Sequence, residues 1–358
     1  MGLEKITGTW RLFYWLTEDL KLATSVAAER YRIMEIVPGG SKHSCIYFLF
    51  DKVESRNLAL KVCKDDRALS EDLIIHRVSS ALPGAVVTVH CVASEPTFPI
   101  YRLILMDKGQ PMKTALHSVS MLIDGYLNPT MKTLFCDMFK AVQAVHSLGY
   151  YHKDLRIENF TAFNENGKLV PKLIDFGLAT AKGDHEWSIN NQECIRPPEF
   201  VFLNRSTPAE AVFYEANHDI YALCMAFMEL LGLQPNFFLS PEVQHEINIM
   251  LQEEFKHCKT LVVRELIGLH PWYQSIRLIF FFGIPPKSFS AFHESPVGRY
   301  LQQKYRFFNL NYLNGEVLAE QLRHESVFLK MMKHSLDWDK SKRVQSCEQL
   351  FELYLNDL

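Results

Sequence analysis

The pattern of apolar residues changes near residues 107–109, and this change limits the folds that the chain can adopt. Before it, four short apolar runs are typical of strands and span residues 31–37, 45–50, 58–62 and 101–106. One helix is predicted among them, over 71–82, where apolar residues recur at helical spacing. After it, the pattern predicts longer helices over 131–148 and 219–231. Strands first and helices afterwards predict an α+β chain with two lobes and a cleft between them.

Length and composition agree with this arrangement and exclude several other classes of protein. The chain has 358 residues, of which 48% are hydrophobic, so it suits two lobes better than one small core. The same composition excludes a disordered or collagen-like chain. Because the chain has 38 Lys and Arg residues and 41 Asp and Glu residues, its net charge is −3, which argues against a dedicated nucleic-acid binder. We therefore expect a globular protein with no nucleic-acid partner.

We expect the protein to reside in the cytoplasm or the nucleus. The first residues include Glu4, Lys5 and Arg11 and do not resemble a signal peptide. The most apolar run, residues 278–282, is too short for a membrane span. The eight cysteines are scattered without a Cys-x-x-Cys pair, which is typical of reduced core cysteines.

Candidate catalytic residues lie in two neighbouring segments, 151–159 (Tyr-His-Lys-Asp-Leu-Arg-Ile-Glu-Asn) and 173–177 (Leu-Ile-Asp-Phe-Gly). Asp154 and Asn159 are five residues apart on a predicted loop, and Asp175 ends a predicted strand. Carboxylate and amide oxygens gathered in one cleft suit a hard cation such as Mg²⁺, which in turn suits triphosphates. The two segments together indicate a site for a metal-bound nucleotide.

These segments resemble the signatures of the eukaryotic protein-kinase family, and the resemblance extends from about residue 31 to the C-terminus. It implies a β-rich N-lobe at 31–107, a mainly α-helical C-lobe at 108–358 and an N-terminal extension at 1–30. It also implies ATP and Mg²⁺ as cofactors and a Ser/Thr protein substrate. Asp154 would accept or orient the proton of the substrate hydroxyl, and Asn159 and Asp175 would hold the metal ions.

Further residues resemble the part of the family that holds the phosphates. Residues 58–61 (Leu-Ala-Leu-Lys) look like the family's Val-Ala-Ile-Lys. By this resemblance Lys61 would hold the α- and β-phosphates and Ala59 would lie against the adenine. Glu71, at the head of the next predicted helix, is the candidate ion-pair partner of Lys61.

The loop that would cover the phosphates falls within residues 37–44, where Gly39 and Gly40 are the glycines present. The family has three glycines there, and any alignment leaves at most one of them in place. Residues with a Cβ cannot adopt positive φ freely, so the backbone would approach the phosphates less closely. We therefore expect weakened ATP affinity.

Residues 106–109 (Met-Asp-Lys-Gly) resemble the hinge between the lobes, and we use this name for them below. Met106 would be the gatekeeper, and the backbones of Asp107 and Gly109 would meet the adenine. Thr161 stands where the family usually has an apolar residue beneath the adenine.

The catalytic segments also depart from the family pattern. Lys153 replaces an Arg that normally binds an activation-loop phosphate bidentately, and Lys does this less well. Gln192 lies where many Ser/Thr kinases place a Thr, and Arg156 replaces the Lys that contacts the transferred phosphate. By the same resemblance, we expect His152 to pack on Phe176 as a structural residue and not to act as a base.

Resemblance leaves the kinase group and the catalytic competence open. Residues 196–199 (Arg-Pro-Pro-Glu) lean toward the cyclin-dependent and SR-protein kinase group, whereas 158–160 lean toward casein-kinase-one-like enzymes. Arg343 should reach back to Glu199, and the stretch at about 232–327 is longer than a minimal kinase needs. The alternative function is that of a weak or inactive pseudokinase that serves as a scaffold or regulatory binding module. A small-molecule phosphotransferase of related fold ranks last.

Overall fold

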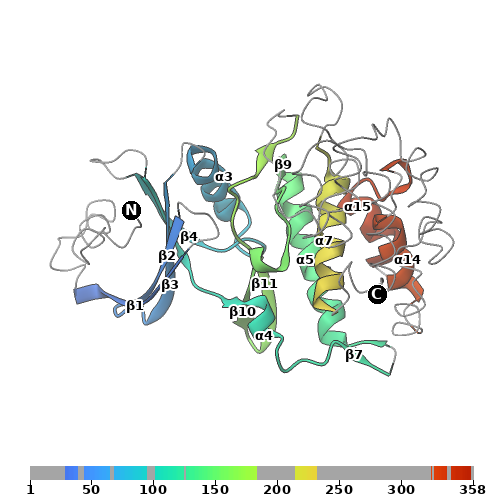
Figure 1. The fold of residues 1–358 in the computed structure, drawn as a ribbon, viewed down its shortest axis with the longest axis horizontal. Coiled ribbons are helices and arrows are strands. Elements are labelled where there is room, and N and C mark those ends of the chain that lie inside the picture. Colours follow the sequence, from blue (N-terminus) through green and yellow to red (C-terminus); the bar gives the residue numbers. More distant parts are fainter. Residues whose placement is uncertain are drawn as a thin grey trace, which may run out of the picture.

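The computed structural model describes residues 29–38, 44–64, 68–94, 101–124, 126–183, 214–231, 324, 326–336 and 340–355. Figure 1 shows a small lobe that carries the strands before residue 108 beside a larger lobe that carries the long helices. The predicted two-lobed α+β fold is therefore confirmed. Most of the predicted extension at 1–30 and of the region at 232–327 lies outside the described residues.

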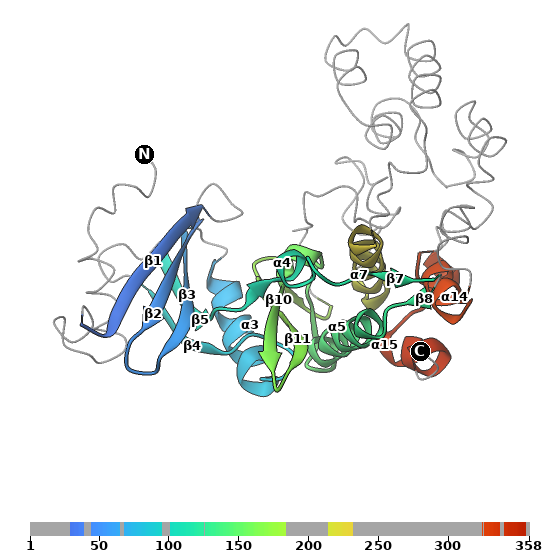
Figure 2. The same cartoon turned by 90° about the horizontal axis from the view of Figure 1, so that it is seen from below.

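The small lobe is a five-stranded antiparallel sheet in the order β1-β2-β3-β5-β4 (Figure 2). Its strands are β1 (Tyr31–Pro38), β2 (Ser44–Asp51), β3 (Arg56–Lys64), β4 (Val89–Ser94) and β5 (Tyr101–Asp107). In β3, Leu58, Leu60 and Val62 are buried. Because side chains alternate along a strand, Ala59 and Lys61 share the opposite face of the sheet.

Helix α3 (Ala68–Ala81) packs beside this sheet and is the helix that the sequence predicts over 71–82. Ile74, Ile75 and Val78 form its buried face, as the helical spacing of these apolar residues requires. The helix ends just before Pro83, which cannot continue it. Glu71 lies in this helix, but its side chain lies outside the described residues.

The lobes are joined where β5 ends. Two residues separate Asp107 from β6 (Gln110–Pro111), which pairs with β10 (Phe160–Glu165), and β10 pairs in turn with β11 (Lys168–Leu173). Val86 forms a parallel bridge with Leu173 and so connects the chain before β4 to the strand that leads toward Asp175. The hinge and this bridge place the candidate nucleotide residues next to the candidate catalytic residues.

Helix α5 (Pro129–Ser147) is the central support of the large lobe. Asn128 caps its first turn by accepting a hydrogen bond from Thr130 N (2.8 Å), and Pro129 stands where a missing N–H is tolerated. Its apolar face packs on α7 (Ala216–Leu230), where the Phe135 and Phe227 rings stack with centroids 4.0 Å apart. The helices predicted over 131–148 and 219–231 are thus confirmed with shifted ends.

Helices α14 (Ser326–Ser335) and α15 (Cys347–Leu350) complete the described helical part of the large lobe. The remaining elements are α4 (Met112–Ala115), β7 (Leu122–Ile123), β8 (Tyr126–Leu127), β9 (Tyr150–Tyr151), β12 (Thr180–Ala181), the 3₁₀ turns η2 (Ile157–Asn159) and η7 (Lys340–Lys342), and the π-helical turn η8 (Phe351–Leu355). In the described part of the chain, no helix has the length and apolar character needed to cross a membrane.

Candidate active site

The loop that carries Asp154 is fixed by one buried carboxylate, that of Asp219 at the start of α7. This carboxylate accepts hydrogen bonds from His152 N (2.8 Å) and Lys153 N (2.9 Å) in the loop. It also accepts from Tyr214 Oη (2.7 Å) and lies 2.8 Å from His146 Nε2. Burial alone would raise the pKa of Asp219, but the hydrogen bond and charge of His146 outweigh it and lower this pKa to about 2.

Asp219 therefore supports a strained stretch of backbone. Lys153 adopts a φ of 65°, a conformation that costs a residue with a Cβ about 1–2 kcal/mol. The hydrogen bond from its N–H to Asp219 holds this conformation. From the sequence alone, Asp219 is only the first residue of a predicted helix. Because the rest of that helix is almost entirely apolar, its position is the one sequence signal that this carboxylate is buried.

Asp154 itself is buried and held by Asn159. The Asn159 amide Nδ2 donates to the backbone oxygen of Asp154 (2.7 Å) and to its carboxylate Oδ2 (2.8 Å). Arg156 Nε lies 3.7 Å from Asp154 Oδ1. Burial raises the pKa of the Asp154 carboxyl, and Arg156 and Asn159 offset only part of this effect. The site thus holds a carboxylate that binds a proton more readily than an ordinary Asp.

Asp175 lies two residues beyond β11, with a φ of 63°, and meets Lys61 from the small lobe. Lys61 Nζ donates to Asp175 Oδ1 at 2.7 Å. Burial raises the pKa of Asp175, but the Lys61 ammonium more than offsets it and holds this pKa below its usual value. Ile174 N donates to Asn159 O (3.0 Å), so the two candidate metal-binding segments are joined through their backbones.

His152 is a structural residue, as predicted. Its ring packs against Phe176 at a centroid distance of 4.8 Å. Its Nε2 lies 3.1 Å from Ile174 O, which can only accept, and its Nδ1 lies 3.3 Å from Asp154 N, which can only donate. These partners place a proton on Nε2, and they leave neither ring nitrogen for a substrate.

The candidate nucleotide-binding side of the site is formed by β3, β5 and the hinge. Ala59 is paired with Met106 across the sheet, and Met106 is buried. Gly109 lies directly on β10: a Cβ built there would lie 2.2 Å from Thr161 Oγ1 and 2.8 Å from a Phe163 ring carbon. Only glycine fits this approach without a shift of neighbouring atoms.

The unexpected Thr161 also finds its explanation at this contact. Its side chain is buried, and its hydroxyl donates to Gln110 O at 3.2 Å. A polar residue is tolerated beneath the hinge because the chain that follows the hinge accepts its hydrogen bond.

Lys153, which stands where the family has an Arg, is buried, and its ammonium group lies 5.6 Å from the centre of the Tyr214 ring.

The roles predicted for several site residues stay predictions. Gly39, Gly40, Gln192 and residues 196–199 lie outside the described residues, as does the side chain of Glu71. Arg343 is buried over the Tyr221 ring (5.0 Å), but its predicted partner Glu199 also lies outside them.

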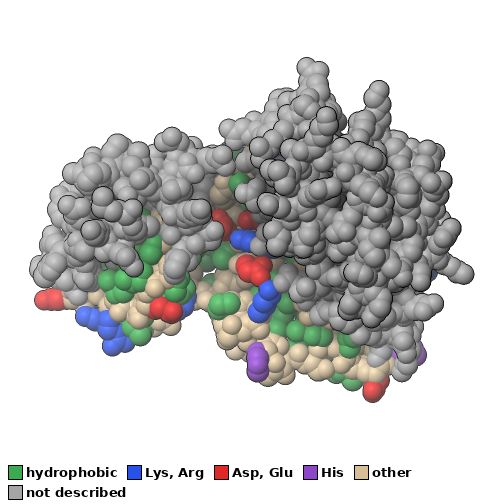
Figure 3. Space-filling model, viewed as in Figure 1, with side chains coloured by type: hydrophobic (Ala, Val, Ile, Leu, Met, Phe, Trp, Pro, Cys, Tyr) green, Lys and Arg blue, Asp and Glu red, His purple; other side chains and the backbone are tan. Residues whose placement is uncertain are grey.

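Figure 3 shows acidic and basic side chains together between the lobes, in the part of the molecule that is described.

The arrangement can hold a nucleotide with its metal. Asp175 supplies carboxylate oxygens and Asn159 supplies an amide oxygen, and both are hard donors of the type that Mg²⁺ prefers together with phosphate oxygens and water. Lys61 adds a positive charge beside them. These residues therefore fit Mg²⁺.

Comparison with known proteins gives the family. The family model described as the protein kinase domain matches residues 31–355, so the chain belongs to the protein kinase family. This chain is similar to the serine/threonine-protein kinase PknD of Chlamydia caviae, with 27% identity over 234 residues. That alignment covers 57% of this chain and 24% of the relative.

Two further proteins are similar to this chain. Mitogen-activated protein kinase 18 of Arabidopsis thaliana is 25% identical over 248 residues, which cover 65% of this chain and 38% of the relative. The chain therefore spans well under half the length of these curated relatives. The solved structure of the Cydia pomonella granulovirus kinase PK-1 matches with a TM-score of 0.54 and 13% identity, over 93% of this chain and 97% of the other, which shows the fold alone.

Proposed function

We propose that this protein kinase is catalytically active and transfers the γ-phosphoryl group of Mg-ATP to Ser or Thr hydroxyls of a protein substrate. One observation carries the proposal: Lys61 reaches Asp175 across the lobes at 2.7 Å. The backbone of the Asp175 segment is in turn joined to Asn159, which holds Asp154. The roles that the resemblance gives to these residues require them to lie close together.

Each of these residues has a defined task in the proposed reaction. Asp154 orients the substrate hydroxyl and holds its proton at a carboxylate oxygen, while Asn159 fixes the rotamer of Asp154. Lys61 and Arg156 supply positive charge for the transferred group. Bound Mg²⁺ would be held by Asp175 and Asn159 and would offset the charge of the phosphates.

Specificity for Ser and Thr is the finer part of the proposal. It is supported by the Ser/Thr kinases among the similar proteins and by the positive charge of Arg156, two residues after Asp154. Arg156 Nε lies 3.7 Å from Asp154 Oδ1, so its charge stands beside the site where the hydroxyl would be activated.

Labelled phosphate transfer tests the proposal. Purified wild type, Asp154→Asn and Asp137→Asn are incubated with γ-labelled ATP, Mg²⁺ and a panel of protein substrates. Asp137 is a matched control because it forms ion pairs with Lys168 on β11 and Lys140 on α5, and no contact with the loop that carries Asp154 is among those described. We expect wild type and Asp137→Asn to incorporate phosphate on Ser or Thr, and Asp154→Asn to fall to background.

Equal background incorporation by all three proteins would refute catalysis. A thermal shift with Mg-ATP then decides what remains. Stabilisation by Mg-ATP without transfer would indicate a nucleotide-binding pseudokinase, and no shift would indicate a scaffold that does not use the nucleotide site.

A further inference from the structure

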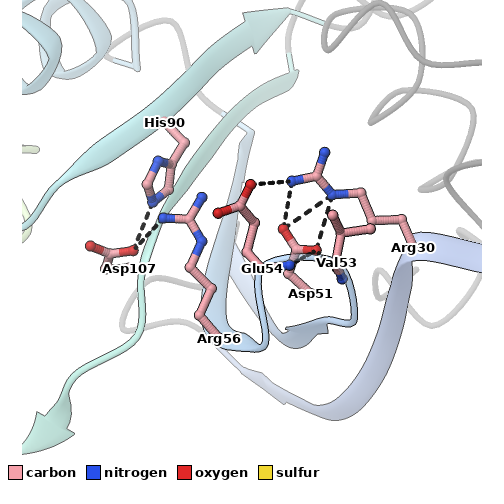
Figure 4. A network of polar contacts seen from close by, with 7 residues as sticks. All are labelled: Arg30, Asp51, Val53, Glu54, Arg56, His90 and Asp107. Atoms are coloured by element: carbon pink, nitrogen blue, oxygen red, sulfur yellow. Dashed lines mark hydrogen bonds and ion pairs between the residues drawn. The ribbon is translucent and has the colours of Figure 1, made fainter.

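Three strands of the small lobe bring charged side chains to one point at the hinge (Figure 4). Asp107, the last residue of β5, lies with its Oδ1 2.7 Å from His90 Nε2 on β4. Arg56, the first residue of β3, lies with its Nη1 3.6 Å from the same oxygen. The Asp107 side chain is thus directed to the neighbouring strands.

The hinge backbone is fastened at the same place. Asp107 N donates to Thr88 O at 3.0 Å, and Lys108 N donates to Asn57 O at 3.1 Å. The Lys108 ammonium lies 3.7 Å from the centre of the Phe48 ring on β2. Backbone and side-chain contacts therefore attach the hinge to β2, β3 and to the chain that leads into β4.

The segment that carries His90 also contacts the large lobe. Val87 N donates to Leu173 O (3.1 Å), and Leu173 N donates to Ala85 O (2.9 Å). On the far side of the hinge, Gly109 is in close contact with Thr161. Residues 85–90 therefore connect the hinge to the strand that leads toward Asp175.

Charge makes the contact with Asp107 strong. Burial raises the pKa of the Asp107 carboxyl, but the hydrogen bond and charge of His90, aided by Arg56, outweigh it and lower this pKa. Asp107 is therefore an anion that accepts a hydrogen bond from His90, and such charge-assisted bonds are stronger than neutral ones.

We propose that His90 is a positioning residue for nucleotide binding, which acts through the Asp107 carboxylate to hold the hinge backbone in place for the base of ATP. The inference rests on the proposed function, because it takes the backbones of Asp107 and Gly109 as the groups that meet adenine. Neither His90 nor Arg56 is assigned contact with the nucleotide.

Calorimetric titration of the full chain with Mg-ATP tests this role. We expect His90→Leu, which removes the donor, to weaken the binding of Mg-ATP about three- to tenfold, less than the full effect of a lost bond to a charged group because His90 acts on the nucleotide only through Asp107. His90→Gln carries an amide N–H that can replace Nε2, and we expect it to restore most of the affinity. We expect a larger change in KM for ATP than in kcat.

Two control variants separate the hinge from general effects. His117 is exposed outside the hinge, and His117→Leu should bind as wild type. Arg30 Nη2 lies 2.7 Å from Asp51 at the same end of the sheet, without a contact to the hinge among the contacts described. Arg30→Gln should lower the unfolding midpoint and leave the affinity for Mg-ATP unchanged. If His90→Leu does not fold, Asp107→Asn replaces it, with the same weakening expected.

Hydrogen exchange without nucleotide gives a readout that does not depend on the proposed function. We expect the amides of Asp107 and Lys108, which donate to Thr88 O and Asn57 O, to exchange at least about fivefold faster in His90→Leu than in wild type, because the local opening free energy falls. Unchanged exchange, or equal affinity of wild type and His90→Leu for Mg-ATP, would overturn the role of His90. A third outcome is faster exchange in His90→Leu together with a wild type that does not bind Mg-ATP. It would overturn nucleotide positioning and the proposed function together, while the structural contact between His90 and Asp107 would stand.

Discussion

Asp219→Asn is the substitution that most directly tests how the loop that carries Asp154 is held. In wild type, Oδ1 accepts from Lys153 N and Tyr214 Oη, and Oδ2 faces His152 N and His146 Nε2. An Asn amide can place its NH₂ on either side. In either orientation the NH₂ group replaces an oxygen that accepted from a backbone N–H, and an NH₂ group cannot accept this hydrogen bond. At least one buried N–H in the loop therefore loses its partner.

The expected cost follows from two contributions. An unpaired buried donor costs about 1–3 kcal/mol. The pKa of Asp219 is about 2 against an ordinary 3.8, so ionisation of this carboxyl stabilises the fold by about 2 kcal/mol. Because the pKa is depressed, this stabilisation is complete above about pH 4 and is lost as pH falls toward 2. We expect Asp219→Asn to lower the free energy of unfolding by about 3–5 kcal/mol at pH 7.

Urea denaturation at pH 7 measures this change, with Asp137→Asn as the matched control. The Asp137 side chain is 18% exposed and its lysine partners are largely exposed, so Asp137→Asn should cost clearly less than Asp219→Asn. Phosphate transfer by the folded variant should also fall, since the loop that carries Asp154 loses an anchor. A cost below 1 kcal/mol for Asp219→Asn would refute the role given to this carboxylate.

Three further outcomes are expected. Gly109→Ala should weaken Mg-ATP binding at least about tenfold in calorimetry because its Cβ would clash with Thr161, whereas Gly84→Ala, with nothing within 4 Å, should bind normally. Because burial raises the pKa of Asp154, kcat/KM should fall with decreasing pH around a midpoint above the ordinary 3.8 of Asp, unlike a profile set by an exposed carboxyl. Lys113→Ala should change the unfolding free energy by less than about 1 kcal/mol although Lys113 and Glu158 are 2.6 Å apart, because both are exposed; a larger loss in denaturation would contradict this.

The sequence predicted the elements with strong periodicity and missed those without it. The four strands predicted before the hinge and the helices corresponding to α3, α5 and α7 are present, and the strand predicted to end at Asp175 is β11, which ends two residues earlier at Leu173. Strand β4 (Val-His-Cys-Val-Ala-Ser) was not predicted, because its short mixture of polar and apolar residues has no clear alternation. Strand β10 was also missed, since Phe160–Glu165 directly follows the candidate catalytic segment with no turn signal between them.

Some residues of the candidate site could be predicted from the sequence and others could not. The order of the motifs predicted that Lys61, Asp154 and Asp175 belong to one site, and the 2.7 Å contact between Lys61 and Asp175 joins residues 114 positions apart. The support of the loop by Asp219 could not be predicted, because nothing local in the sequence tells which buried donors a carboxylate will meet some 66 residues away. The same holds for His90, whose partner lies on another strand.

Phosphate transfer by wild type and Asp154→Asn, compared at equal concentration with γ-labelled ATP and Mg²⁺, is the most direct test of the proposed catalysis. The structure leads us to expect incorporation on Ser or Thr by wild type and at least about a hundredfold loss in the variant, the scale of one general-base contribution. Asp137→Asn should match wild type. Equal incorporation by wild type and Asp154→Asn, at any level, would contradict the role of Asp154 and with it the proposed catalytic mechanism.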